Sequence, residues 1–144
     1  MILAKILFAL HQFFPQFYTG TETLTLEVAK ELQVRGHQVS ILCVEPNTAD
    51  CSCTEKAEFR HTFYDGIPVW RIFTGVDGDL VERLECESYD RRLIPLFREI
   101  LLQEKPDIVH AFHFMRLTLS FAETVKDLGL PLYFTATDFW LMCP

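Results

Sequence analysis

The chain has 144 residues, of which 49% are hydrophobic and 23% charged, and its formal net charge is −7 at pH 7. This length and balance predict about one globular domain with its own core. The negative charge argues against a nucleic-acid partner, because phosphate backbones are bound by clustered Lys and Arg. The sequence has no apolar run long enough for a membrane-spanning helix and no signal-peptide pattern, so we expect a cytoplasmic protein.

An apolar run over residues 2–10 predicts a first buried parallel strand. Residues 11–20 then predict a long loop, and long loops in compact domains are usually functional or disordered. Gly20 near the loop's end would let backbone N–H groups of a helix N-terminus face a phosphate or another anion. On the local pattern alone the alternative is simpler, with Thr21 capping the helix and Gly20 only easing the turn.

A helix is predicted over residues 24–35, followed by Gly36 as its stop and a second strand over residues 38–44. Its apolar positions recur every four residues and predict a buried stripe. That stripe consists of Leu24, Val28 and Leu32. In this arrangement Glu22 can face water.

The rest of the pattern predicts an antiparallel hairpin, then helix, strand, helix and strand. Asp65-Gly66 lies between two strand-like runs and is a strong two-residue hairpin signal. The expected elements cover residues 59–64, 67–73, 93–103, 108–112, 117–128 and 132–136. This order predicts an α/β fold, with a Rossmann-like, doubly wound, mostly parallel sheet and the hairpin at one edge.

Ligands of such sheets bind outside the C-terminal strand ends, where the strand order reverses. We therefore expect residues 11–20, 110–113 and 137–140 to converge on one cleft. His110 is expected to be buried and hydrogen-bonded at the strand end. Alternation along the strand predicts that His113 is more exposed and lines the cleft. Neither a Gly-x-Gly-x-x-Gly fingerprint nor a Walker loop follows the first strand.

Three segments together resemble the N-terminal domain of GT-B glycosyltransferases, specifically the retaining glycosyltransferase family 4. They read His11-Gln-Phe-Phe-Pro15 with Thr19-Gly-Thr-Glu22 and Arg35-Gly-His-Gln-Val39, then Lys105-Pro-Asp-Ile-Val-His110, then Thr135-Ala-Thr-Asp-Phe-Trp-Leu-Met-Cys-Pro144. The chain departs from the family pattern at three positions. Family members have Gly at the position of Thr19, His at that of Thr137, and often a second His at that of Phe112.

The resemblance implies transfer of a sugar from a nucleotide-sugar to an acceptor hydroxyl with retention, without a metal or other cofactor. The implied donor-phosphate contacts are Thr19, Gly20 and Thr21. The implied catalytic residues are Asp138 and His113, and the cleft positions are Glu22, His110, Phe112 and Thr137. From the residues alone, Glu22 could equally interact with the helix N-terminus, and Asp138 could form an Asx turn.

The resemblance also implies that residues 1–144 are an acceptor-side domain, incomplete at its C-terminus and without the nucleotide-sugar domain. We then expect the chain alone to be inactive. Its partners would be a nucleotide-sugar and a carbohydrate or lipid-linked acceptor, with peripheral contact to the inner face of the membrane. The alternative is a non-catalytic α/β binding or interaction module, which Thr19 and Thr137 keep open. An uncovered last strand followed by the apolar residues 139–142 predicts self-association.

Overall fold

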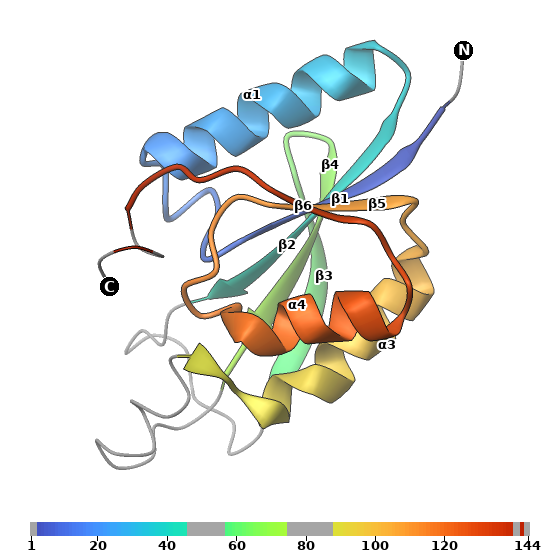
Figure 1. Cartoon of the computed structure of the whole chain (residues 1–144). Coiled ribbons are helices and arrows are strands. Elements are labelled where there is room, and N and C mark those ends of the chain that lie inside the picture. The colour runs from blue at the N-terminus through green and yellow to red at the C-terminus, as the bar shows by residue number, and fades with distance from the viewer. Residues whose placement is uncertain (1–2, 46–56, 75–87, 140–141, 143–144) are drawn as a thin grey trace.

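The computed structural model describes residues 3–45, 57–74, 88–139 and 142. In this part of the chain a six-stranded sheet has the order β3-β4-β2-β1-β5-β6 (Figure 1). The strands are β1 (Lys5–Leu10), β2 (Gln38–Glu45), β3 (Glu58–Tyr64), β4 (Ile67–Phe73), β5 (Ile108–Ala111) and β6 (Leu132–Phe134). Neighbouring strands run parallel except for β3 and β4. The mostly parallel α/β sheet is therefore confirmed.

Helices cover both faces of the sheet, as Figure 1 shows. The helical elements are α1 (Gly20–Val34), the 3-10 turn η1 (Arg91–Leu93), α3 (Ile94–Glu104) and α4 (Thr118–Asp127). Leu26 and Ala29 of α1 share one apolar cluster with Phe8 and Ile41, whereas α3 and α4 pack on the opposite face. Because β1 and β2 are covered on both faces, their sequences are almost continuously apolar.

The hairpin lies at the sheet edge formed by β3, as predicted. Its turn residues Asp65 and Gly66 have φ values of 50° and 79°. Both are left-handed, which is the requirement of a type I′ turn and matches the twist of the flanking strands. Tyr64 pairs with Ile67 directly across this turn.

Helix α1 begins at Gly20 rather than at residue 24, and Gly36, with φ of 90°, follows its end as predicted. The predicted buried stripe is confirmed only in part. Val28 and Leu32 are partly buried and pack against the core, whereas Leu24 is 43% exposed. The buried residues of α1 are Glu22, Thr25, Leu26 and Ala29. The short side chains of Thr25 and Ala29 allow the helix to lie close to the sheet, and this turns Leu24 toward solvent.

Helix α3 carries Pro95 in its first turn, where a missing backbone N–H costs nothing. Helix α4 is followed by Gly129, whose φ of 69° reverses the chain toward β6. Within the described ranges, no helix combines the length and apolar character that crossing a membrane requires.

Candidate functional site

Three segments that are distant in sequence meet at the C-terminal ends of β1 and β5. The strand order of the sheet reverses between these two neighbouring strands. The rings of His11, after β1, and His113, after β5, have centroids 4.2 Å apart. Thr21 in the first turn of α1 donates a hydrogen bond of 2.9 Å to Thr137 after β6. In Figure 1 the C-terminal segment passes beside the start of α1. The predicted convergence of the three segments is confirmed.

His113 is held in one tautomer by its two neighbours. Its Nδ1 accepts a hydrogen bond of 3.1 Å from the backbone N–H of Met115. The ring proton therefore lies on Nε2, which donates to the Asp138 carboxylate at 2.7 Å. His113 is only 4% exposed, whereas the Asp138 side chain is 51% exposed. The pair thus presents a carboxylate to solvent and anchors it on a buried imidazole.

His11 is a buried, neutral imidazole at the bottom of this site. It is 6% exposed, and its Nε2 lies 3.4 Å from Glu22 Oε1. Burial lowers the pKa of His11 to about 4, and the nearby His113 and Arg116 oppose its charging further. The carboxylates of Glu22 and Asp138 favour the charged ring, but their effect is smaller.

Glu22 is fully buried, so the expectation that it faces water is wrong. Because α1 starts at Gly20, Glu22 belongs to the first helical turn and lies under the loop that follows β1. Burial alone would raise the pKa of Glu22. Hydrogen bonds to its carboxylate, of which that from the Thr19 hydroxyl has the largest effect, and the neighbouring His11 outweigh burial, so the pKa is lowered overall. Among the described residues, buried Glu22 Oε1 and His11 Nδ1 have no hydrogen-bond partner.

The N-terminus of α1 is open to a ligand at Gly20. Thr19, and not Thr21, occupies the N-cap position, but its hydroxyl bonds Glu22 instead of capping a backbone N–H. A Cβ atom built onto Gly20 would meet no other atom within 4 Å. Gly20 therefore leaves room for an anion from solvent beside the start of the helix, where the helix dipole favours negative charge.

The burial of the two strand-end histidines is the reverse of the prediction. His110 is only half-buried; its Nε2 lies 2.8 Å from Thr135 Oγ1, and its ring stacks on buried Phe112. Burial lowers the pKa of His110. Because β5 ends at Ala111, alternation does not continue to His113, which enters the following turn and packs inward. Thr137 is half-buried and donates to the Phe112 carbonyl at 3.1 Å.

Two arginines that the sequence analysis missed hold the main chain of the loop after β1. Arg116 donates to the carbonyl of His11 and to Gln12 Oε1, each at 2.9 Å. Arg71, only 8% exposed, donates to the carbonyl of Phe14 and forms a buried ion pair with Glu45. The sequence could have indicated the role of Arg71, because a single cation inside the apolar run of β4 requires a buried partner.

In the described part of the chain, no three His, Cys, Asp or Glu side chains lie close enough together to share a metal ion. The site is instead a set of paired polar groups beside a helix N-terminus, at the reversal point of a doubly wound sheet. This places the protein in the class of Rossmann-like domains whose ligands bind at the C-terminal strand ends.

Comparison with known proteins identifies the family. Residues 19–143 match the family described as "Glycosyl transferase 4-like domain", and the chain belongs to this family. The solved catalytic domain of Starch Synthase IV from Arabidopsis thaliana, bound to ADP and acarbose, has a similar fold. The TM-score is 0.59 with 18% sequence identity, over 96% of this chain and 34% of that chain. No curated protein sequence is similar enough to count as a match.

The fold is therefore that of the N-terminal, Rossmann-like domain of a GT-B glycosyltransferase of the family 4 type. The chain spans about a third of the length of the starch synthase chain.

Proposed function

We propose that this chain is the acceptor-side part of a glycosyltransferase that moves a sugar from a nucleotide-sugar to an acceptor hydroxyl with retained configuration. The observation that carries the proposal is the position of two features at one edge of the sheet. These are the open N-terminus of α1 at Gly20 and the His113–Asp138 pair. The similar starch synthase was bound to ADP, which supports a nucleotide-sugar as donor.

In this proposal the donor phosphate lies at the N-terminus of α1. The backbone N–H groups of Gly20 and Thr21 donate to it, and the helix dipole stabilises its negative charge. Thr19 contributes only through its backbone, because its hydroxyl already bonds Glu22. The buried Glu22 carboxylate restricts how deeply an anion can enter, since like charges repel in a site of low dielectric constant.

Asp138 orients the acceptor hydroxyl by accepting a hydrogen bond from it. His113 fixes the carboxylate by donating from Nε2, and the N–H of Met115 fixes the imidazole in turn. The departing diphosphate oxygen takes the proton of the acceptor hydroxyl as the new glycosidic bond forms on the same face of the sugar. No metal ion takes part in this scheme. His110 and Thr137 lie beside the acceptor as parts of the cleft. The expectation that Phe112 lines the cleft is wrong, because Phe112 is 2% exposed and packs in the apolar core.

We further propose that a second domain supplies most of the contacts to the nucleotide and that residues 1–144 alone do not catalyse transfer. Without the preorganised groups around the diphosphate, several kcal/mol of transition-state stabilisation are missing. The acceptor class, a carbohydrate or a lipid-linked sugar, remains a prediction. So does a cytoplasmic location at the inner face of the membrane.

Titration of the isotope-labelled chain with ADP, UDP and GDP tests the donor site. We expect millimolar nucleoside diphosphate to shift the amide resonances of Gly20 and Thr21 in NMR spectra. Gly20→Val, which places a branched side chain at the open N-terminus, should abolish these shifts. Leu24→Val is the matched control, because Leu24 is exposed on the same helix. Unchanged amide shifts in the original chain would favour the non-catalytic binding module.

A turnover assay tests the second part of the proposal. We expect the chain, incubated with UDP-, GDP- and ADP-sugars, to release no more sugar than a heat-inactivated sample. Release above that background would contradict the need for a second domain. In a longer active protein, Asp138→Asn should reduce transfer by about 100-fold. Asp127→Asn, at a similarly exposed carboxylate distant from the cleft, should not.

A further inference from the structure

Arg116 joins the ends of three neighbouring strands. It belongs to the turn between β5 and α4, and the sheet order places β1 between β2 and β5. Its Nε and Nη2 atoms donate to the carbonyl of His11, after β1, at 3.1 and 2.9 Å. Nε also donates to the carbonyl of Val44 in β2 at 3.3 Å. One side chain from the turn after β5 therefore ties the ends of β1 and β2 to that turn.

The turn that carries Arg116 has a strained backbone. Arg116 and Thr118 have φ values of 61° and 62°, in the left-handed region that residues other than glycine rarely adopt. Such strain persists where surrounding contacts fix the conformation, and it concentrates at functional sites. The same turn contains Met115, whose N–H orients the ring of His113. A single strained turn thus holds both the imidazole that anchors Asp138 and the guanidinium of Arg116.

A series of contacts leads from Arg116 to the start of α1. Arg116 Nη2 donates to Gln12 Oε1 at 2.9 Å. Burial would raise the pKa of Glu22, and hydrogen bonding from Thr19 and then from Gln12 lowers it. Thr19, whose hydroxyl bonds the Glu22 carboxylate, immediately precedes Gly20. The turn after β5 is therefore connected through Gln12 and Glu22 to the start of the helix.

Glu22 requires a compensating positive charge because its carboxylate is fully buried. His11 lies 3.4 Å away but is neutral at pH 7, since burial lowers its pKa to about 4. Arg71 is already paired with Glu45. Burial lowers the pKa of Arg116, and the Glu45 and Glu22 carboxylates oppose this shift. Arginine stays protonated in proteins, so of these three basic side chains Arg116 is the one whose charge is left to offset Glu22.

We propose that Arg116 is a positioning residue for an anion at the start of α1 and acts by offsetting the buried charge of Glu22. This role rests on the donor-phosphate site of the proposed function. Without compensation, the Glu22 carboxylate would repel a phosphate arriving at Gly20, because charges interact strongly where water is excluded. With Arg116 in place the two charges offset each other, and the helix dipole can attract the anion.

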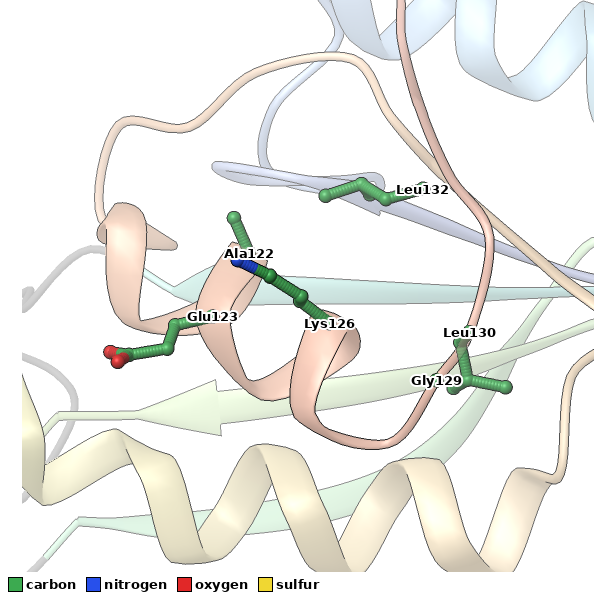
Figure 2. Close-up of a pocket in the computed structure, with 6 residues that line it drawn as sticks. All are labelled: Ala122, Glu123, Lys126, Gly129, Leu130 and Leu132. Carbon is green, nitrogen blue, oxygen red and sulfur yellow. The ribbon is translucent and has the colours of Figure 1, made fainter.

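A hollow of about 550 Å³ beside α4 lies apart from this site. Figure 2 shows Glu123 and Lys126 of α4 and Leu132 of β6 among the residues that line it. Gly129 in its lining precedes β6, so the hollow lies beside the N-terminal end of that strand. The candidate site follows the C-terminal ends of the strands. An anion that shifts the amide resonance of Gly20 can therefore be distinguished from one bound near Lys126.

Calorimetric titration of the 144-residue chain with inorganic pyrophosphate at pH 7 tests the role of Arg116. We expect Arg116→Gln, which removes the charge, to weaken binding about tenfold or more. Arg116→Lys keeps the charge and should weaken binding less. Arg98→Gln is the matched control, because it makes the same change in net charge at a 45% exposed side chain of α3. Solvent and salt screen that charge, so Arg98→Gln should have little effect.

Glu22→Gln tests the mechanism, because it removes the carboxylate charge and keeps a side chain of the same shape. Alone, it should strengthen pyrophosphate binding. Combined with Arg116→Gln, it should bring binding close to that of the original chain. A purely structural role of Arg116 predicts no such recovery, since its contacts to His11 and Val44 remain lost. Circular dichroism checks that each variant is folded, and the Gly20 amide shift in NMR spectra locates the bound pyrophosphate.

Several results would overturn the proposal. Two concern Arg116→Gln, namely a loss of affinity no larger than in Arg98→Gln, and no recovery on adding Glu22→Gln. A third is unchanged binding in Glu22→Gln alone, which does not depend on the folding of an Arg116 variant. A fourth is a Gly20 amide that pyrophosphate does not shift in the original chain, which would remove the donor site as well. The expected binding pattern without sugar transfer by a longer protein would instead refute the proposed function and leave the role of Arg116 intact.

Discussion

Acidification should destabilise this protein through His11. In the folded state this imidazole is 6% exposed and lies against His113, Glu22 and Arg116, with Asp138 nearby. Burial, and then the neighbouring His113 and Arg116, lower its pKa from 6.5 to about 4. In the unfolded chain the ring is solvated and binds a proton near pH 6.5. Between these two values the unfolded state binds more protons than the folded state.

The direction and size of the change in the free energy of unfolding follow from this difference in proton binding. Well above pH 6.5 the ring is neutral in both states and has no effect on the pH dependence. As the pH falls, proton uptake favours the unfolded state, so the free energy of unfolding decreases. The loss reaches about 2 kcal/mol by pH 5 and about 3 kcal/mol at pH 4, at about 1.4 kcal/mol for each tenfold change in proton affinity. Such a loss is a large part of the stability of a typical domain.

Urea unfolding followed by circular dichroism between pH 7 and pH 5 measures this loss. We compare the chain with His11→Gln, which keeps a polar side chain but removes the titration. The pKa of half-buried His110 is also lowered. Because His110 is present in both proteins, its effect on the pH dependence cancels in the comparison. The pKa of Glu22 is lowered from its ordinary value of 4.5, so its titration affects stability only below that pH, outside the range measured. His61→Gln, at an exposed position on β3, is the control.

The expected result is a much flatter pH dependence in His11→Gln and an unchanged one in His61→Gln. Equal slopes in the original chain and His11→Gln would refute the reasoning. So would an NMR titration that gives His11 a pKa near 6.5.

Three further predictions concern stability and can be measured by urea unfolding at pH 7. Arg71→Met should cost about 3–5 kcal/mol because it leaves the buried Glu45 carboxylate unpaired, and adding Glu45→Met should recover most of the loss. Gly20→Ala should stabilise by about 0.5–1 kcal/mol, since the added Cβ meets no neighbour, while weakening nucleoside diphosphate binding. Gly66→Ala should destabilise by about 1 kcal/mol or more, because φ of 79° is unfavourable for alanine.

The features that could be predicted from the sequence are those set by local chemistry. Asp65-Gly66 determines its turn because both residues must adopt positive φ, and Gly36 ends α1 for the same reason. The order of strands and helices then fixes which strand ends share an edge. This was enough to bring Gly20, His113 and Asp138 to one side of the sheet.

The features that could not be predicted depend on contacts between distant segments. Glu22 is buried because the loop after β1 covers it and His11 lies beside it, and neither contact can be read from helical spacing. His113 is buried because its strand ends two residues earlier and the turn folds inward. The bonds of Arg71 and Arg116 to main-chain carbonyls span 57 and 105 residues of sequence, and no local pattern encodes them.

These contacts between distant segments have one property in common, which is that forming them costs desolvation free energy. The buried His11, the buried Glu22, the buried Arg71 and the half-buried Arg116 each lose hydration, and apolar residues of similar volume would often be at least as stable. They gather at the C-terminal strand ends, whereas the described middle of the sheet is apolar apart from Ser40 of β2. Costly polar groups at the edge where Rossmann-like domains bind ligands indicate that this end of the domain is built for recognition. The pH dependence of His11 measures part of that cost directly, which makes it the most informative first experiment.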